Sequence, residues 1–212
     1  MAGERTAERV HRAALRLFAT RGFEGTGIRE IAAAAGITAA SLYHYVGTKE
    51  DLLEQMMLES MAALLAPARE LAGTVSDPAQ LVASLVTLHV RRHAEHDQLC
   101  RVGDTELRSL SAARRGRVIE LRDAYQAIWE EAIAQGVHAG QFAVPDVKLA
   151  ALALLQMCTG VAHWYSPSGR LTIGQVSGAF VDMAAALLGS PAGAQRAVSR
   201  PAGAAAAAGG HG

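Results

Sequence analysis

A short polar stretch, ITAASLYHYVGTKE at residues 37–50, has the clearest binding chemistry in the sequence. Hydroxyl, imidazole and ammonium donors stand close together there, at Tyr43, His44, Tyr45 and Lys49. Donors of these types bind phosphate oxygens. The preceding residues 38–41 (TAAS) are small and uncharged, so a helix that presents them is slim enough to enter a DNA major groove about 12 Å wide.

Lys49 adds to this signal because of its position. It lies in the first turn of an expected helix, where the helix dipole disfavours a cation unless an anion is close by. Stretch 37–50 therefore predicts contact with a phosphate backbone.

A second group of ligand-type side chains lies near the middle of the chain, at His89, His93, His96 and Cys100. Their spacing would place them on one face of a continuous helix, where three imidazoles and a thiolate could bind zinc. Residues 94–97 (AEHD) instead indicate a break between helices, and Arg91 and Arg92 disfavour a bound cation. We favour histidines that are hydrogen-bonded in a core or line a pocket. A helical metal-binding protein or enzyme built on this segment is the alternative.

Catalytic signatures are lacking in the sequence. We find no nucleophile–base pair, phosphate-binding loop or HExxH motif, and therefore expect no enzyme, no cofactor and no metal. A ligand carrier without DNA binding is a third hypothesis, but it would leave the small polar front of residues 38–41 unexplained.

The composition limits the class of protein. The chain has 212 residues, enough for one large domain or for a small domain joined to a larger one. Half of the residues are apolar and alanine is abundant, which favours helices. Lys and Arg total 20, as do Asp and Glu, so the net charge is zero. This balance excludes a coat of basic tails but not a local DNA-binding surface.

The sequence also bears on the location of the protein. We find no apolar run of eighteen residues, and the N-terminus lacks the apolar core of a signal peptide. We expect a cytoplasmic protein without a membrane partner. Cys100 and Cys158 are far apart without CxxC spacing, so we expect buried thiols.

Helical signals recur along the chain. Val10, Ala14 and Phe18 follow helical spacing, and Thr48 with Asp51 resembles a capping box at the start of a long helix. No segment alternates as a strand would. We predict an all-α fold of about nine helices: a first ending at Gly22, then about 27–35, 38–45, 49–71, one opening at Pro78, and 97–108, 111–138, 146–165 and 172–188.

Two of the short helices suit a helix-turn-helix. This motif needs a small residue in its first helix, a glycine at the turn and an apolar anchor in the second helix, and Ala32, Gly36 and Leu42 meet these needs. An ordinary hairpin in an Ala-rich bundle is the alternative, but it does not explain the uncharged front of residues 38–41. We expect an N-terminal three-helix head at 1–48, a C-terminal helical bundle at 49–189 and a disordered tail at 190–212.

The N-terminal part resembles the TetR/AcrR family of bacterial transcriptional repressors. The matching pieces are Leu17-Phe18-Ala19, Arg21-Gly22-Phe23, Thr26, Ile31-Ala32-x-x-Ala35-Gly36-Ile37, Ser41 to Tyr45, and Lys49-Glu50-x-Leu52-Leu53. The resemblance implies a DNA-binding set of Thr26, Arg29, Thr38, Ala39, Ala40, Ser41, Tyr43, His44, Tyr45 and Lys49. Two residues depart from the family pattern: Gly27 replaces a usual Ser or Thr, and Val46 replaces a common Phe.

The same resemblance implies a homodimer that binds palindromic operator DNA and is released by a small-molecule effector. The dimer surface would come from helices 146–165 and 172–188. Small and apolar residues in these helices suit either an interface or a core, namely Ala150, Leu154, Met157, Phe180 and Ala184.

The C-terminal part is similar to a subgroup that regulates lipid and steroid catabolism and senses acyl-CoA thioesters. The similarity lies in DTELRSL at 104–110, in 122–125 and in 163–169. Arg114, Arg115 and Arg117 form either a solvated charge run or a site for CoA phosphates. The expected pocket residues are His89, His93, Cys100, Leu107, Tyr125, Trp129, Met157, His163 and Trp164, although core packing explains the large apolar ones equally well.

Overall fold

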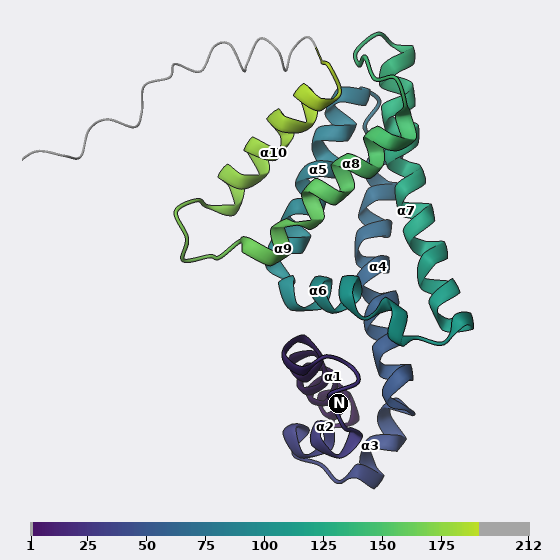
Figure 1. The fold of residues 1–212 in the computed structure, drawn as a ribbon, viewed down its shortest axis with the longest axis vertical. Coiled ribbons are helices and arrows are strands. Elements are labelled where there is room, and N and C mark those ends of the chain that lie inside the picture. The colour runs from purple at the N-terminus through teal and green to yellow at the C-terminus, as the bar shows by residue number, and fades with distance from the viewer. Residues whose placement is uncertain (1, 191–212) are drawn as a thin grey trace, which may run out of the picture.

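The computed structural model describes residues 2–190, and within that range the protein is helical with no strand (Figure 1). The helices are α1 (Ala2–Arg21), α2 (Ile28–Ala35), α3 (Ala39–Val46), α4 (Lys49–Thr74), α5 (Pro78–Glu95), α6 (Asp97–Thr105), the 3₁₀ turn η1 (Leu107–Ser109), α7 (Ala112–His138), α8 (Val147–Thr159), α9 (Val161–Trp164) and α10 (Ile173–Leu187). The predicted all-α fold is confirmed. The segment expected as one helix at 146–165 is divided at Gly160 into α8 and α9, and the expected tail lies outside the described residues apart from Ser190.

Local capping defines the short helices of the head. Gly36 ends α2 with a φ of 69°, in the left-handed region that glycine tolerates. Thr38 begins α3 by accepting a hydrogen bond from the Ser41 backbone N–H. Thr48 and Asp51 form the expected capping box at the start of α4. These caps explain how three helices fit into so few residues.

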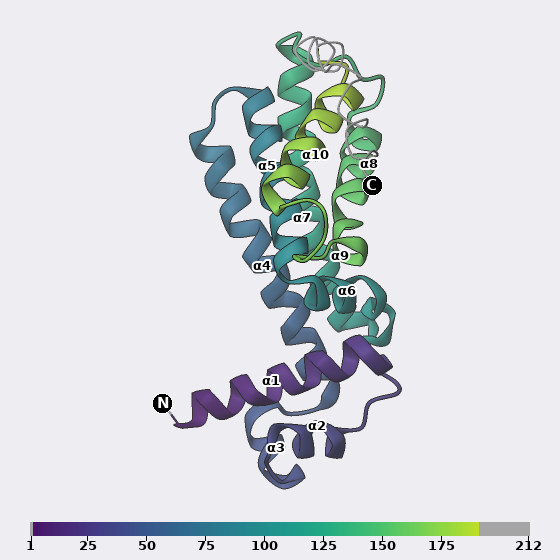
Figure 2. The same ribbon diagram turned by 90° about the vertical axis from the view of Figure 1, so that its left-hand side faces the viewer.

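The head has a hydrophobic core of its own, into which Phe18, Ile31 and Leu42 are buried. The first turns of α4 belong to this cluster, and so do Val102 of α6 and Val118 of α7. Figures 1 and 2 show the head at one end of an elongated molecule, with α4 running from it into the body. The head is thus joined to the body by shared apolar packing as well as by the chain itself.

A second core holds the body together. Trp129, Ile133 and Leu154 are fully buried in it, packed among α4, α5, α7, α8 and α10. Burying large apolar side chains of this kind stabilises a fold by about 1.5–3 kcal/mol each. The body is therefore a rigid frame for any site that its helices enclose.

One segment departs from the expectation that no apolar run is long enough to cross a membrane. By length and composition alone, Val147–Trp164 is long and apolar enough to cross a membrane. Its mean hydropathy is 1.3 over 18 residues, and 33% of it is buried inside the protein. The core helix of a protein outside a membrane passes the same test. The segment comprises α8 and α9.

Candidate nucleic-acid interface and ligand cavity

The exposed face of α3 carries most of the residues expected to contact DNA. Tyr43 is 53% exposed and Tyr45 is 43% exposed, whereas Leu42 between α3 and the head core is fully buried. Ala40 and His44 are exposed as well. A single helix thus turns its anchor inward and its aromatic hydroxyl and imidazole groups outward.

Thr38 and Ser41 form a hydrogen-bonded pair at the start of α3. Their hydroxyl oxygens are 2.9 Å apart, and the Ser41 backbone N–H donates to Thr38 Oγ1 at 3.1 Å. Ala39 lies beside them, half-buried. Hydroxyls bond to bases of either type, and methyl groups suit the thymine methyl. The N-terminal end of α3 therefore offers one fixed hydroxyl pair and small apolar contacts.

Thr26 is a correction to the expected DNA-binding set. Its side chain is 1% exposed, and its hydroxyl donates to the Gly22 carbonyl at 2.8 Å. Because the only hydroxyl proton is used inside the head, the side chain cannot donate to a phosphate. Thr26 instead holds the turn between α1 and α2, while Arg29 of the same region is exposed.

Lys49 has internal partners that its sequence position did not reveal. Its Nζ donates to the carbonyls of Phe23 at 2.8 Å and Thr26 at 3.0 Å, and lies 4.0 Å from the centroid of the Phe23 ring. These groups provide the negative partner that a lysine at a helix N-terminus needs. Lys49 therefore clamps α4 to the α1–α2 turn and keeps at most one ammonium proton for a phosphate.

At the start of α2, Gly27 stands where the family usually has Ser or Thr, and Glu30 compensates for the missing hydroxyl. The Gly27 N–H donates to Glu30 Oε2 at 2.8 Å, and Arg21 Nη1 lies 2.8 Å from Glu30 Oε1. The hydrogen bond from Gly27, followed by the charge of Arg21, lowers the pKa of Glu30. The helix is capped here without the usual hydroxyl.

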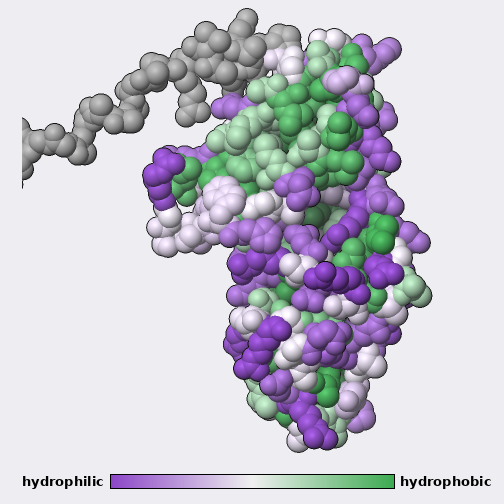
Figure 3. Space-filling model, in the orientation of Figure 1, coloured by the Kyte–Doolittle hydropathy of each residue, from purple (hydrophilic) through white to green (hydrophobic). Residues whose placement is uncertain are grey.

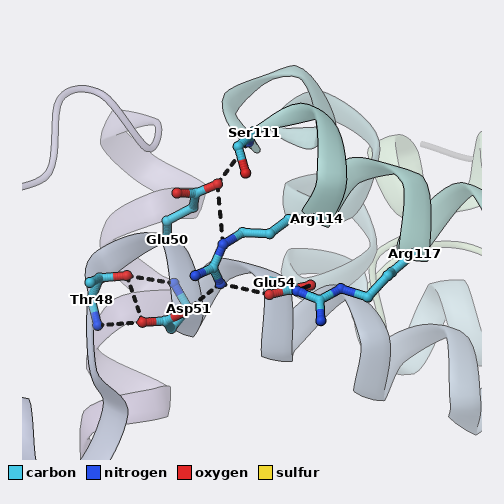
Figure 4. Close-up of polar contacts among 7 residues, drawn as sticks. All are labelled: Thr48, Glu50, Asp51, Glu54, Ser111, Arg114 and Arg117. Carbon is cyan, nitrogen blue, oxygen red and sulfur yellow. Dashed lines mark hydrogen bonds and ion pairs between the residues drawn. The ribbon is translucent and has the colours of Figure 1, made fainter.

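A polar cluster connects the first turns of α4 to the start of α7 (Figure 4). Glu50 accepts a hydrogen bond from the Ser111 N–H at 2.7 Å. Arg114 lies between three carboxylates, contacting Asp51, with 2.7 Å to Glu54 and 3.5 Å to Glu50. The hydrogen bond from Ser111 lowers the pKa of Glu50. The cluster fixes the position of α7 relative to the base of α4.

This cluster counts against one of the two alternatives for the arginine run, the one in which the arginines meet CoA phosphates. The buried carboxylate of Glu54 pairs with Arg117 at 2.6 Å as well as with Arg114. Two of the three arginines thus neutralise carboxylates of α4. The third, Arg115, is half-buried.

The body contains a cavity of about 440 Å³ among α4 to α9. Figure 3 shows it as a hollow on the same face as the green apolar patch, below that patch. Its lining is mixed, with apolar walls from α4 and α8 and polar groups from α6, α7 and α9. It is formed by Met57, Ser60, Met61, Leu64, His93, Cys100, Gly103, Asp104, Val118, Arg122, Tyr125, Gln126, Leu152, Leu155, Gln156, Thr159, Gly160 and His163.

The expected pocket residues divide into those that line this cavity and those that do not. His93, Cys100, Tyr125 and His163 line it. The others are corrections. Trp129 is fully buried in the body core, Met157 packs against that core, and Leu107 packs against the head cluster. Trp164 is 55% exposed and borders a separate shallow hollow.

His89 lies in the core behind the cavity wall. Its ring nitrogens are 3.2 Å from Tyr125 Oη and 3.1 Å from Thr159 Oγ1, and its ring stacks on that of His93 at 4.0 Å. Burial lowers the pKa of His89, and it lowers that of His93 to about 4. Both rings are therefore neutral near pH 7.

The alternative metal site is contradicted by this geometry. Both nitrogens of His89 are hydrogen-bonded, His93 Nδ1 lies 3.0 Å from the His89 carbonyl, and burial raises the pKa of the Cys100 thiol to about 12. His96 is exposed at the end of α5. Within residues 2–190, no group of three or more His, Cys, Asp or Glu side chains is placed to hold a metal ion.

Several polar residues of the cavity were not expected as site residues. Arg122 Nη2 donates to the Gly103 carbonyl at 2.8 Å and lies 3.7 Å from Asp104. Gln126 and Gln156 add two amides to the same lining. Arg122 and Asp104 lie in segments that resemble the acyl-CoA-sensing subgroup. This resemblance is the signal in the sequence that could have identified them as site residues.

An exposed apolar surface covers α8 and α10, the green region of Figure 3. Its large members are 41–64% exposed: Leu149, Leu152, Met183 and Leu187. The residues first considered for an interface lie elsewhere. Ala150, Leu154, Phe180 and Ala184 are all buried in the body core. These four residues therefore have the core role that the sequence left open for them, and the exposed apolar side chains lie on other faces of the same two helices.

Family models match both parts of the chain. Residues 11–56 match bacterial regulatory proteins of the tetR family, and residues 75–188 match the tetracyclin repressor-like C-terminal domain. The HTH-type transcriptional repressor KstR2 of Rhodococcus jostii RHA1 is 29% identical over 177 residues, 82% of this chain and 87% of its own length. The fatty acid metabolism regulator of Bacillus subtilis is 25% identical over 139 residues, 65% of this chain and 72% of its own.

Solved structures agree with these matches. A tetR-family regulatory protein from Rhodococcus RHA1 superposes with a TM-score of 0.82 at 29% identity, covering 87% of this chain and 97% of its own. AibR in complex with isovaleryl coenzyme A and operator DNA gives a TM-score of 0.77 at 26% identity, covering 84% and 97%. With both domains matched, the chain belongs to the TetR family, as a transcriptional repressor with a helix-turn-helix DNA-binding head and a ligand-binding C-terminal domain.

Proposed function

We propose that this protein binds palindromic operator DNA as a cytoplasmic homodimer and is released from it by an acyl-CoA or another lipid-like effector. The observation that carries the proposal is the exposed face of α3, which presents uncharged small residues followed by Tyr43 and Tyr45. A helix with a buried anchor and such a face suits the major groove.

The roles of the head residues follow from their exposure. Tyr43, His44 and Tyr45 donate to phosphates, joined by Arg29 from α2. Thr38 and Ser41 contact base edges, and Ala39 and Ala40 contribute methyl contacts. Few hydrogen bonds to bases are available, so half-site spacing of about 34–36 Å supplies part of the specificity.

The exposed surface of α8 and α10 supports the homodimer. Leu149 is 64% exposed and Met183 is 45% exposed, and side chains of this size are stabilised by burial against a second copy. A twofold arrangement of four helices, α8 and α10 from each chain, covers this surface and presents two copies of α3 to one face of DNA.

The cavity supports a lipid-like effector. Its volume of about 440 Å³ is within the range of small-molecule sites, and it opens to the surface. Met57, Met61 and Leu155 suit an acyl chain, while Arg122 and Gln126 suit polar groups. AibR, solved with isovaleryl coenzyme A and operator DNA, supports this class of effector. Release requires that the effector bind the DNA-free arrangement more tightly than the DNA-bound one.

DNA binding is tested by fluorescence anisotropy on fragments upstream of the protein's own gene and its neighbours, at low salt. Tyr43→Phe removes only a hydroxyl that is exposed, so the fold is unaffected. Loss of a hydrogen bond to a charged phosphate costs about 1.5–3 kcal/mol, so we expect affinity to fall at least tenfold. Wild-type protein that binds none of these fragments, or Tyr43→Phe that binds as tightly as wild type, would contradict the proposal.

The homodimer is tested by light scattering. The wild type is expected at twice the chain mass of 22.2 kDa, and Leu149→Glu at the mass of one chain. Ile119→Glu is the matched control, because Ile119 is 39% exposed on α7, away from the apolar surface. A monomeric wild type, or equal dissociation by both variants, would count against an interface on α8 and α10.

A further inference from the structure

The lining of the effector cavity divides into a buried part and an exposed part. Met57 and Leu64 of α4 and His93 of α5 belong to the buried part, and His93 is 5% exposed. Gln156 and His163 are exposed and belong to the part that meets solvent. His93 is thus a polar side chain that lines the cavity from an otherwise largely apolar interior.

The ring of His93 is held in one orientation and one tautomer. Its Nδ1 lies 3.0 Å from the His89 carbonyl oxygen, one turn earlier in α5, and the two imidazole rings stack with centroids 4.0 Å apart. A carbonyl oxygen only accepts hydrogen bonds, so Nδ1 carries the hydrogen. Burial lowers the pKa of His93 to about 4, so the ring is neutral near pH 7. In this tautomer the other nitrogen, Nε2, can only accept.

This acceptor has no partner inside the protein. Within residues 2–190, His93 Nε2 makes no hydrogen bond, and it is not one of the fully enclosed nitrogens that lack a partner. The nitrogen therefore has accessible surface, and the hollow that His93 lines is the effector cavity. Buried polar groups in native proteins are nearly always hydrogen-bonded. A donor on a molecule bound in the cavity would supply the missing partner.

The other buried polar groups of the lining lack this restriction. The Tyr125 hydroxyl is paired with His89 at 3.2 Å, and Cys100 Sγ lies 4.0 Å from a backbone carbonyl oxygen. The Ser60 hydroxyl can rotate to donate or to accept, so it does not distinguish the two kinds of ligand group. Among these buried lining residues, His93 is the one whose available atom accepts and cannot donate.

We propose that His93 selects an effector that carries a hydroxyl group on its acyl part, with Nε2 accepting the hydrogen bond from that hydroxyl. This rests on the acyl-CoA effector proposed above and specifies its class as a hydroxylated thioester. A plain acyl chain would displace solvent from Nε2 and leave the acceptor unpaired, which costs binding free energy. A ketone at the same carbon would bring a second acceptor to Nε2 and gain nothing.

The pantetheine part of a CoA thioester also carries N–H and O–H donors and is the other source of such a hydrogen bond. Its charged phosphates stay near solvent, at the part of the lining where His163 is exposed and Arg122 is half-buried. His93 belongs to the buried part. The acyl chain is therefore the part of the ligand that reaches Nε2.

Calorimetric titration of CoA thioesters into the full-length protein tests this selection. The ligands are octanoyl-CoA and three hydroxyoctanoyl-CoA isomers, with the hydroxyl near the thioester, at mid-chain or near the methyl end. We expect one isomer to bind about tenfold more tightly than octanoyl-CoA. The oxo-octanoyl-CoA with its ketone at the same carbon should bind no more tightly than octanoyl-CoA.

Two variants assign the preference to a residue. His93→Phe keeps a ring to stack on His89 and removes the acceptor, so the preferred isomer and octanoyl-CoA should bind equally. Gln156→Leu is the matched control, because it removes an exposed polar side chain of the same lining. The tenfold preference should persist in it.

Several outcomes would overturn the proposal. Wild-type protein that prefers no hydroxy isomer, or binds the ketone as tightly as the alcohol, refutes it without any variant. A preference that persists in His93→Phe places the acceptor elsewhere, and equal weakening of all thioesters there assigns the hydrogen bond to pantetheine. If octanoyl-CoA binds without any preference among the isomers, the selection alone is wrong. If no thioester binds, the acyl-CoA effector itself is wrong, and the selection with it.

Discussion

The head and the body place their proposed binding residues in opposite ways. In the head, most lie on α3 and its flanks and are exposed, Tyr43 by 53% and Tyr45 by 43%. In the body, the cavity takes its lining from six helices, between Met57 and His163. A surface built on one short helix depends on local spacing and caps. A cavity depends on the packing of distant segments, which local spacing does not encode.

The same two regions differ in how they respond to acid. At the base of α4, hydrogen bonds from Ser111 and Thr48 lower the pKa values of Glu50 and Asp51. Their contribution to stability is lost only as the pH falls through those lowered values. In the body, burial lowers the pKa values of His89 and His93 from an ordinary 6.5, so stability is lost at milder acidity.

The largest effect is expected in the head. Leu42 is its fully buried anchor, and Leu42→Ala leaves a cavity beside Ile31 and Phe18. We expect the free energy of unfolding to fall by about 2–5 kcal/mol, measured by urea denaturation. Tyr43→Ala, one residue further on, should stay within about 0.5 kcal/mol because its side chain is exposed. Equal losses for the two variants would break the distinction between anchor and contact residues.

The second largest effect is expected in the body, where titration of His93 should change the free energy of unfolding by about 3 kcal/mol. The pKa of His93 falls from 6.5 to about 4 on folding, and each unit is worth about 1.4 kcal/mol. Because the unfolded chain binds the proton more tightly, stability is full above pH 6.5 and declines as the pH falls to 4. His93→Gln should flatten the dependence of the unfolding free energy on pH in this window. The same slope in His93→Gln and wild type would show that His93 does not titrate on unfolding.

A smaller effect is expected on release by the effector, which should depend on the body and not on the head. Gly103 lines the cavity, and a side chain there would meet no atom within 4 Å of its Cβ. Gly103→Leu should keep operator affinity and need at least tenfold more acyl-CoA thioester for release, about 1.4 kcal/mol. Gly116→Leu, with equal space on α7 outside the cavity, is the control. If neither variant alters release, the effector binds somewhere other than this cavity.

The ends of the helices in the head could be predicted closely from the sequence, because caps and anchors act over a few residues. Gly36, Thr38 and Thr48 have the roles that their residue types indicate. Thr26 and Lys49 were placed less well. Whether a threonine is buried, or a lysine meets carbonyls 23 and 26 residues earlier, depends on the tertiary fold.

In the body, the helices were predicted from the sequence, but the residues that line the cavity were predicted less well. Trp129 and Arg122 lie on the same helix, and their types favour the aromatic ring as the pocket residue, yet the ring is fully buried and the arginine lines the cavity. Arg114 is a second case in which the role of a residue depends on distant segments. Its partners are carboxylates some 60 residues earlier, so the sequence alone shows it only as part of a charge run.

The smallest effect that we expect is on salt dependence, and it concerns Lys49 at the boundary of the two regions. Each phosphate contact that is lost lowers the slope of log affinity against log salt by about one. Arg29→Ala should show this change, because Arg29 is exposed. Lys49→Met should weaken the head yet alter the slope by clearly less than one, since two of its three ammonium protons serve Phe23 and Thr26. Anisotropy titrations at several salt concentrations measure both slopes. A full change in Lys49→Met would show that the third proton reaches a phosphate, and that Lys49 is at once a clamp of the head and a contact to DNA.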